Sequence, residues 1–198
     1  MKKPALVFVT ALLCTLLAAC SLPQAPQTQL HYLLAAKRHG PALTASYDTL
    51  RLVPLRAAAP YDSPYFVYRE TEQRYIVDPY RGFILPPAQQ ISERMRDWLG
   101  ISGLARHVVG PGPMPVQVRL EGELTRFDVD LRPGQPPAVT VALRLRLEDE
   151  ASQTLLLDQT FTTNERLSVV TPDGIAAAFD SATAQLLSEV ELALQSHH

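Results

Sequence analysis

Residues 139–148 read Val-Thr-Val-Ala-Leu-Arg-Leu-Arg-Leu-Glu, with an apolar side chain at every second position. Strict alternation places these side chains on one face of a β-strand, so the stretch predicts a half-buried strand. Similar patterns lie on either side, over residues 116–131 and 155–161, and the first of them changes phase near Thr125, which predicts a β-bulge. Three long strands joined by short polar turns predict an antiparallel meander.

Two helices are predicted beside the meander. The first begins at Pro86 and Pro87, where the fixed φ of proline is tolerated, and we expect it to stop at Gly100. The second follows Thr171-Pro172-Asp173, which is typical of a helix N-terminus. Apolar side chains at helical spacing form one stripe on each helix: Ile91, Met95, Trp98 and Leu99 on the first, and Ile175, Phe179, Ala182, Leu186, Val190 and Leu194 on the second.

The N-terminal half predicts shorter elements. Strands are expected over residues 31–34, 49–55 and 104–109. Residues 65–69 and 74–78 flank a polar tip and predict a hairpin, and residues 79–85 are expected to form a loop. Together these elements predict one α+β domain over residues 30–198, with a mixed, mostly antiparallel sheet and two main helices packed on it.

Composition limits the class of protein. The chain has 198 residues, of which 46% are hydrophobic and 19% charged, so it is too apolar to be disordered throughout. The formal net charge is −2, so no overall positive field attracts nucleic acid, and we expect no nucleic-acid partner.

Residues 1–19 are typical of a bacterial signal peptide. Lys2 and Lys3 precede an uncharged stretch that is short for a membrane-spanning helix. The stretch ends in Leu-Ala-Ala followed by Cys20, which resembles the lipobox of bacterial lipoproteins, so Cys20 is the predicted lipidation site. The alternative is an ordinary secretory signal with a cysteine that happens to lie at the cleavage site.

Residues 20–29 are expected to form a lipidated tether, because proline and glutamine without apolar periodicity cannot build a core. Ser21 resembles an outer-membrane sorting signal, which predicts attachment to the outer membrane on its periplasmic face. Cys14 leaves with the signal and Cys20 becomes a thioether, so the mature chain is expected to hold no free thiol.

Patterns that carry chemistry are absent from the sequence. The five histidines lack metal-ligand spacing, and Ser102 misses the spacing of a nucleophile elbow. Asp128 and Asp130 lie two residues apart on a predicted strand, and we expect them to decorate a solvated face. The sequence therefore predicts no catalytic residue, no cofactor and no metal site.

Aromatic residues are concentrated between Tyr61 and Trp98, and arginines are interleaved among them. Tyrosine and arginine are enriched in protein interfaces. The candidate partner-binding residues are Tyr61, Tyr65, Tyr80, Arg81 and Phe83, and a loop is expected to expose Tyr80 and Phe83. The alternative is plain packing between the hairpin and the first helix.

A family resemblance rests on several stretches in a characteristic order. They are the lipobox, Tyr32-Leu33-Leu34, Leu50-Arg51-Leu52-Val53-Pro54-Leu55, Tyr65-Phe66-Val67-Tyr68-Arg69, Asp78-Pro79-Tyr80, Phe83-Ile84-Leu85-Pro86-Pro87-Ala88 and Arg96-Asp97-Trp98-Leu99. In this order they resemble the ABC-type transport auxiliary lipoprotein family, which includes the PqiC-like lipoproteins. The resemblance is strongest over residues 50–99.

The resemblance implies a non-enzymatic outer-membrane lipoprotein of an MCE-type lipid transport system, in which an inner-membrane ABC transporter or a paralogous membrane protein works with a periplasmic MCE assembly. It implies that the protein docks the distal end of that assembly, with lipid as a second candidate partner. Two other classes stay open: a structural or assembly lipoprotein of another envelope machine, and an envelope hydrolase with a spatially assembled site.

Overall fold

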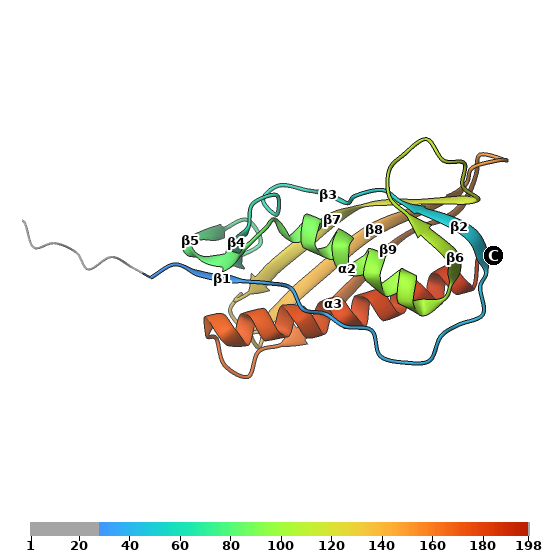
Figure 1. The fold of residues 1–198 in the computed structure, drawn as a ribbon. Helices are drawn as coiled ribbons and strands as arrows, with labels where there is room; N and C mark the ends of the chain where they lie inside the picture. Colours follow the sequence, from blue (N-terminus) through green and yellow to red (C-terminus); the bar gives the residue numbers. More distant parts are fainter. Residues whose placement is uncertain (1–27, 198) are drawn as a thin grey trace, which may run out of the picture.

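The antiparallel meander is present as predicted. In the computed structural model, which describes residues 28–197, it consists of β7 (Val118–Asp130), β8 (Ala138–Asp149) and β9 (Thr154–Arg166). The register of β7 against β8 shifts between Leu124 and Arg126, which confirms the bulge predicted near Thr125. Figure 1 shows these strands as the long central ribbons of the sheet.

Shorter strands complete a mixed sheet that has nine strands in the described part of the chain. They are β1 (Leu30–Tyr32), β2 (Tyr47–Leu52), β3 (Arg56–Ala57), β4 (Tyr65–Arg69), β5 (Tyr75–Phe83) and β6 (Ala105–Val109). Strands β2, β3 and β4 pair with β7 in parallel, and β2 also pairs in parallel with β6. The main path through the sheet is β1-β5-β4-β7-β2-β6, so β7 is its centre.

Two helices, α2 (Pro87–Ser102) and α3 (Pro172–Gln195), cover one face of the sheet (Figure 1). The cap of α3 is as predicted, because the Thr171 hydroxyl accepts a hydrogen bond from the amide of Gly174 at 3.2 Å. The predicted end of α2 at Gly100 is wrong. The helix continues to Ser102 and stops at Gly103, whose φ of 75° is left-handed and favours glycine.

The core lies between the helices and the sheet. Every side chain of the two predicted helical stripes is buried, together with the inward-facing residues of β8. Four phenylalanines join the layers: Phe66 on β4, Phe83 on β5, Phe127 on β7 and Phe179 on α3. The rings of Phe127 and Phe179 stack with their centroids 4.0 Å apart. These observations confirm the predicted single α+β domain.

The predicted hairpin of β4 and β5 is present, but the loop expected over residues 79–85 is wrong in part. Strand β5 continues through Pro79 to Phe83, and its register against β4 shifts between Tyr65 and Val67. The extra residues of β5 form a bulge instead of ending the strand. Gly82 pairs with Tyr65 beyond this bulge, and an added Cβ there would lie 2.3 Å from the Pro64 carbonyl oxygen.

The segment after β1 crosses the helical layer. Its Leu34 side chain is buried, and the Leu34 amide donates a hydrogen bond to Oε1 of Gln90 on α2. The Ala35 amide donates to Oδ1 of Asp180 on α3 at 2.7 Å. The N-terminal segment is therefore fastened to both helices. In residues 28–197, no helix is both long and apolar enough to span a bilayer.

Candidate partner-binding surface

Asp78 holds the bulge of β5 in place. Its Oδ1 accepts hydrogen bonds from the amides of Tyr80 at 2.9 Å and Arg81 at 3.2 Å. The carboxylate is buried, while Tyr80 is 41% exposed and about half of the Arg81 side chain is exposed. A short polar side chain that bonds the backbone two and three residues ahead stabilises a turn, so Asp78 presents these two side chains to solvent in a fixed geometry.

Tyr68 reinforces this arrangement from the neighbouring strand. Its hydroxyl donates to Oδ2 of Asp78 at 3.4 Å, and the guanidinium of Arg81 lies 3.5 Å from the same oxygen. Burial, followed by the nearby Asp78 carboxylate, raises the pKa of Tyr68. The phenol therefore stays protonated and remains a donor at neutral pH.

Exposed apolar side chains lie beside the bulge. Ile76 on β5 and Val170, in the loop before α3, are both about half exposed. With Tyr68, Arg81 and other residues they line a shallow hollow of about 290 Å³. We call Ile76, Tyr80, Arg81 and Val170 the bulge surface. It combines apolar area, a phenol and a guanidinium, which is the composition that favours protein interfaces.

The bulge surface adjoins the point at which the described chain begins. Strand β1 pairs in parallel with β5, and Leu30 lies opposite Arg81. The described chain enters the domain at this end, next to β4 and β5 (Figure 1). Any segment that precedes residue 28 therefore starts beside the bulge surface.

The five predicted partner-binding residues differ in their exposure to solvent. Tyr80 and Arg81 are exposed as expected, and Tyr65 is half-buried. The expected exposure of Phe83 is wrong: it is 1% exposed, because its ring packs against Phe66, Phe127 and Phe179. Tyr61 is 5% exposed and also belongs to the interior.

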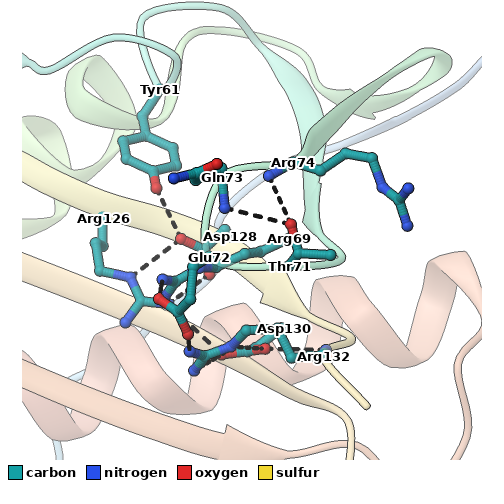
Figure 2. A network of polar contacts seen from close by, with 10 residues as sticks. All are labelled: Tyr61, Arg69, Thr71, Glu72, Gln73, Arg74, Arg126, Asp128, Asp130 and Arg132. Atoms are coloured by element: carbon teal, nitrogen blue, oxygen red, sulfur yellow. Dashed lines mark hydrogen bonds and ion pairs between the residues drawn. The ribbon is translucent and has the colours of Figure 1, made fainter.

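Tyr61 belongs to a polar network on the face of the sheet that points away from the two helices. Figure 2 shows its hydroxyl pointing at Asp128, to which it donates at 2.8 Å. Arg126 donates to both oxygens of the same carboxylate, at 2.8 and 3.1 Å. Burial, together with the charge and hydrogen bond of Asp128, raises the pKa of Tyr61 far above its ordinary value.

The network continues to the tip of the hairpin. Arg132 donates to both oxygens of Asp130 and also bonds Glu72 in the hairpin tip, and Glu72 pairs with Arg69 (Figure 2). Hydrogen bonds from Arg132 hold the pKa of Asp130 below its usual range. The network fastens the tip to the end of β7, so the strands that carry the bulge surface have a rigid support.

The expectation that Asp128 and Asp130 lie on a solvated face is wrong. Asp128 is fully buried and Asp130 nearly so, because Tyr61 and the hairpin tip cover that end of the sheet. Both carboxylates are neutralised by arginine, so neither is a free general base. Across residues 28–197, no three His, Cys, Asp or Glu side chains come close enough together to hold a metal ion.

Sequence reasoning missed Asp78, although Asp78-Pro79 is a recognised turn signal. It also missed Ile76 and Val170, which only the fold brings together. The predicted lipidation site Cys20 and the sorting residue Ser21 lie outside the described residues.

Solved structures with the same fold are known. Protein XCC0632 of the DUF330 family from Xanthomonas campestris is 22% identical, with a TM-score of 0.72, over 84% of this chain and 93% of its own. A second, uncharacterised protein is 14% identical, with a TM-score of 0.68, over 84% of this chain and 98% of its own. The hypothetical protein CT253 from Chlamydia trachomatis is 9% identical, with a TM-score of 0.52, over 75% of this chain and 98% of its own.

No curated protein matches the chain. A family model does match, over residues 32–191, and its description is ABC-type transport auxiliary lipoprotein component. The match extends from β1 almost to the end of α3 and so includes the bulge surface and the network that supports it. The chain belongs to the family of ABC-type transport auxiliary lipoproteins.

Proposed function

We propose that this protein is an outer-membrane lipoprotein, held by lipid on Cys20, that docks a periplasmic MCE-type assembly of an ABC transport system through its bulge surface. Family membership supports the auxiliary role in transport. The signal sequence, the lipobox and Ser21 support the proposed location at the outer membrane. One observation carries the docking role: Tyr80 and Arg81 are exposed, and the buried carboxylate of Asp78 holds both of their backbone amides by hydrogen bonds.

The position of the bulge surface suits such a role. The seven residues between Cys20 and Thr28 allow the two to lie at most about 30 Å apart when the chain is fully extended. The chain then enters the domain beside Arg81. A partner bound at the bulge surface would therefore be held close to the membrane that carries the anchor.

Rigidity of the bulge surface also favours binding. Ordering a flexible loop on association costs free energy, which lowers affinity. Here Asp78 fixes the bulge, and the Arg132–Glu72 contact fixes the hairpin tip beyond it. Tyr80 and Arg81 are thus presented before the partner arrives, as expected for residues that contribute most of the binding energy.

A binding experiment tests the docking role. The double variant Tyr80→Ala/Arg81→Ala should weaken capture of the periplasmic MCE subunit of the same system by about thirtyfold for each 2 kcal/mol lost. The matched control is Leu192→Ala/Arg106→Ala, which also removes one exposed apolar side chain and one exposed arginine, but from α3 and β6. If both variants fold and bind the subunit like the wild type, the docking surface lies elsewhere.

A second experiment tests the anchor independently. Cys20→Ser should leave the protein unlipidated and outside the outer-membrane fraction, while its binding to the isolated subunit stays unchanged. Mass spectrometry of the membrane fraction measures the modification directly. Mature, membrane-bound protein with an unmodified Cys20 would contradict the proposed address without affecting the docking role.

A further inference from the structure

Strand β9 is the longest open edge of the sheet. Within residues 28–197 it pairs only with β8, and it has 13 residues, whereas the strands β1 and β6 at the ends of the main path have three and five. Alternate residues of an edge strand point their backbone N–H and C=O groups away from the sheet, where a further strand can bond them. β9 therefore offers a template for strand pairing.

The sequence of β9 does little to block such pairing. Proline, lysine and bulges are common blocking devices. Residues 157–166 hold neither proline nor lysine, and the register against β8 runs without a shift from Leu157 onward. The consecutive side chains of Asp158, Gln159 and Thr160 are all exposed, although they alternate between the two faces. Solvent therefore reaches the edge itself.

Helix α3 also leaves this edge accessible. It packs on one face of β9, where the hydroxyl of Thr163 donates to the Ala182 carbonyl oxygen at 2.9 Å. Between α3 and the end of β9 lies a hollow of about 220 Å³, which Glu165 and Arg166 help to line. The residues that α3 contributes to this hollow are all small: Gly174, Ala177, Ala178 and Ser181. The helix thus leaves room for an added strand beside this end of β9.

Charge decides which strand fits the edge. Within the described chain, the guanidinium of Arg166 takes part in no ion pair or hydrogen bond. Asp158 lies eight residues earlier on the same face of β9, and it accepts hydrogen bonds from Arg144 at both oxygens, each at 2.9 Å. A carboxylate offers about four acceptor positions, so Asp158 can accept a further guanidinium. The edge thus carries a free cation at one end and an available anion at the other.

We propose that β9 pairs antiparallel with β9 of a second copy of this chain, about a two-fold axis normal to the sheet. Antiparallel pairing sets the free cation of each copy against the carboxylate of the other. The two sheets would then continue into one another, with the helices of both copies on the same face. In the sheet, β7 and β8 separate β9 from the strands of the bulge surface, so this inference does not depend on the proposed docking function.

The charges also fix the register of the pairing. Paired residues lie on the same face, so one residue at the axis pairs with its own copy. Only Thr162 at the axis brings Asp158 opposite Arg166, because an axis at either neighbouring residue would set Arg166 opposite Leu156 or Thr160. The other pairs are then free of like charges: Gln159 with Glu165, Thr160 with Asn164, and Phe161 with Thr163.

Reversing the two charges tests the pairing. The full mature chain carrying Cys20→Ser should dimerise reversibly in sedimentation equilibrium. Asp158→Arg or Arg166→Asp, added singly, sets like charges opposite one another twice in each dimer and should weaken dimerisation about tenfold or more. An equimolar mixture of the two variants restores both Arg–Asp pairs and should dimerise like the parent. Arg106→Asp, which changes an exposed arginine on β6, is the charge control and should leave dimerisation unchanged.

A cysteine at the axis tests the register. In the same Cys20→Ser chain, Thr162→Cys should form an intermolecular disulfide on oxidation with diamide, because residues directly opposite in antiparallel strands have Cα atoms about 4.5–5.5 Å apart. Thr160→Cys is the matched control, since its two copies lie about 13 Å apart along the strands and should not cross-link.

Three outcomes would overturn the proposal. The first is a parent chain that stays monomeric at every concentration, as expected if the edge takes a strand of a different protein. The second is a mixture of the folded Asp158→Arg and Arg166→Asp variants that associates no better than either alone. The third is equal cross-linking of Thr160→Cys and Thr162→Cys. Circular dichroism of each variant checks that it is folded.

Discussion

The indole nitrogen of Trp98 lies 2.6 Å from Oε2 of Glu191, and this hydrogen bond joins α2 to α3. The same carboxylate binds Arg38, whose side chain is only 6% exposed, so one buried residue fastens the N-terminal segment to both helices.

Replacement of Glu191 should therefore be costly. Glu191→Gln removes the negative charge and leaves the buried Arg38 guanidinium without its counter-ion, which should lower the free energy of unfolding by about 3–5 kcal/mol. Chemical denaturation measures this change. Glu189→Gln, on a more exposed part of the same helix, is the control and should change stability by less than about 0.5 kcal/mol. Equal midpoints for the two variants would contradict the assigned role of Glu191.

The inward face of β8 can be tested by truncation. Leu143 is fully buried between the sheet and the helices, so Leu143→Ala should cost about 2–5 kcal/mol by leaving a cavity. Thr162→Ala on the neighbouring strand changes an exposed side chain and is the control. An unchanged thermal midpoint for Leu143→Ala would mean that the inward face of this strand is assigned wrongly.

Gly82 and Gly112 differ in whether the fold leaves room for a side chain at their positions. In Gly82→Ala the new methyl group would lie within 3 Å of the backbone of Pro64 and Tyr65, so the hairpin must shift and stability should fall by about 1–3 kcal/mol. Gly112→Ala places the same methyl group in open space and should be nearly neutral. Thermal unfolding of the two variants, measured side by side, checks the difference, and equal midpoints would be inconsistent with the bulged pairing of β4 and β5.

The Asp130–Arg132 contact makes stability depend on pH. Hydrogen bonds from Arg132 lower the native pKa of Asp130, whereas the unfolded value is about 3.9. The contribution of ionised Asp130 to the free energy of unfolding is therefore fully present above the unfolded pKa and is lost as the pH falls through the native pKa. Asp130→Asn should lower the thermal midpoint at pH 7, and its difference from the wild type should shrink below about pH 4. A difference that stays constant down to pH 2 would contradict the lowered pKa.

Local patterns predicted much of the fold. The alternation in β8 placed Leu143 and Leu145 in the core, and the stripe of α2 placed Met95 and Trp98 there. These predictions hold because side-chain direction follows directly from the period of a strand or a helix. The predicted helix stop failed because two glycines are compatible with a stop locally, and the left-handed conformation that ends α2 occurs at Gly103 and not at Gly100.

The candidate site was predictable only in part. Composition named Tyr80 and Arg81 as candidates, because tyrosine and arginine are enriched in protein interfaces, and the structure shows both side chains exposed. Phe83 has the same chemistry and is buried, since the strand continues through residues 79–83 and turns its ring into the phenylalanine cluster. Asp128 was misplaced because alternation gives the outward face of a strand but cannot show that Tyr61, 67 residues away, covers that face.

The sequence by itself determined the signal and lipobox pattern, the meander, both helices and the family resemblance, because these depend on residues that are neighbours along the chain. Only the tertiary structure decided which charges are paired and which aromatic rings are buried. Burial and charge pairing depend on contacts between distant segments, such as Arg38 with Glu191, and no local period encodes such contacts.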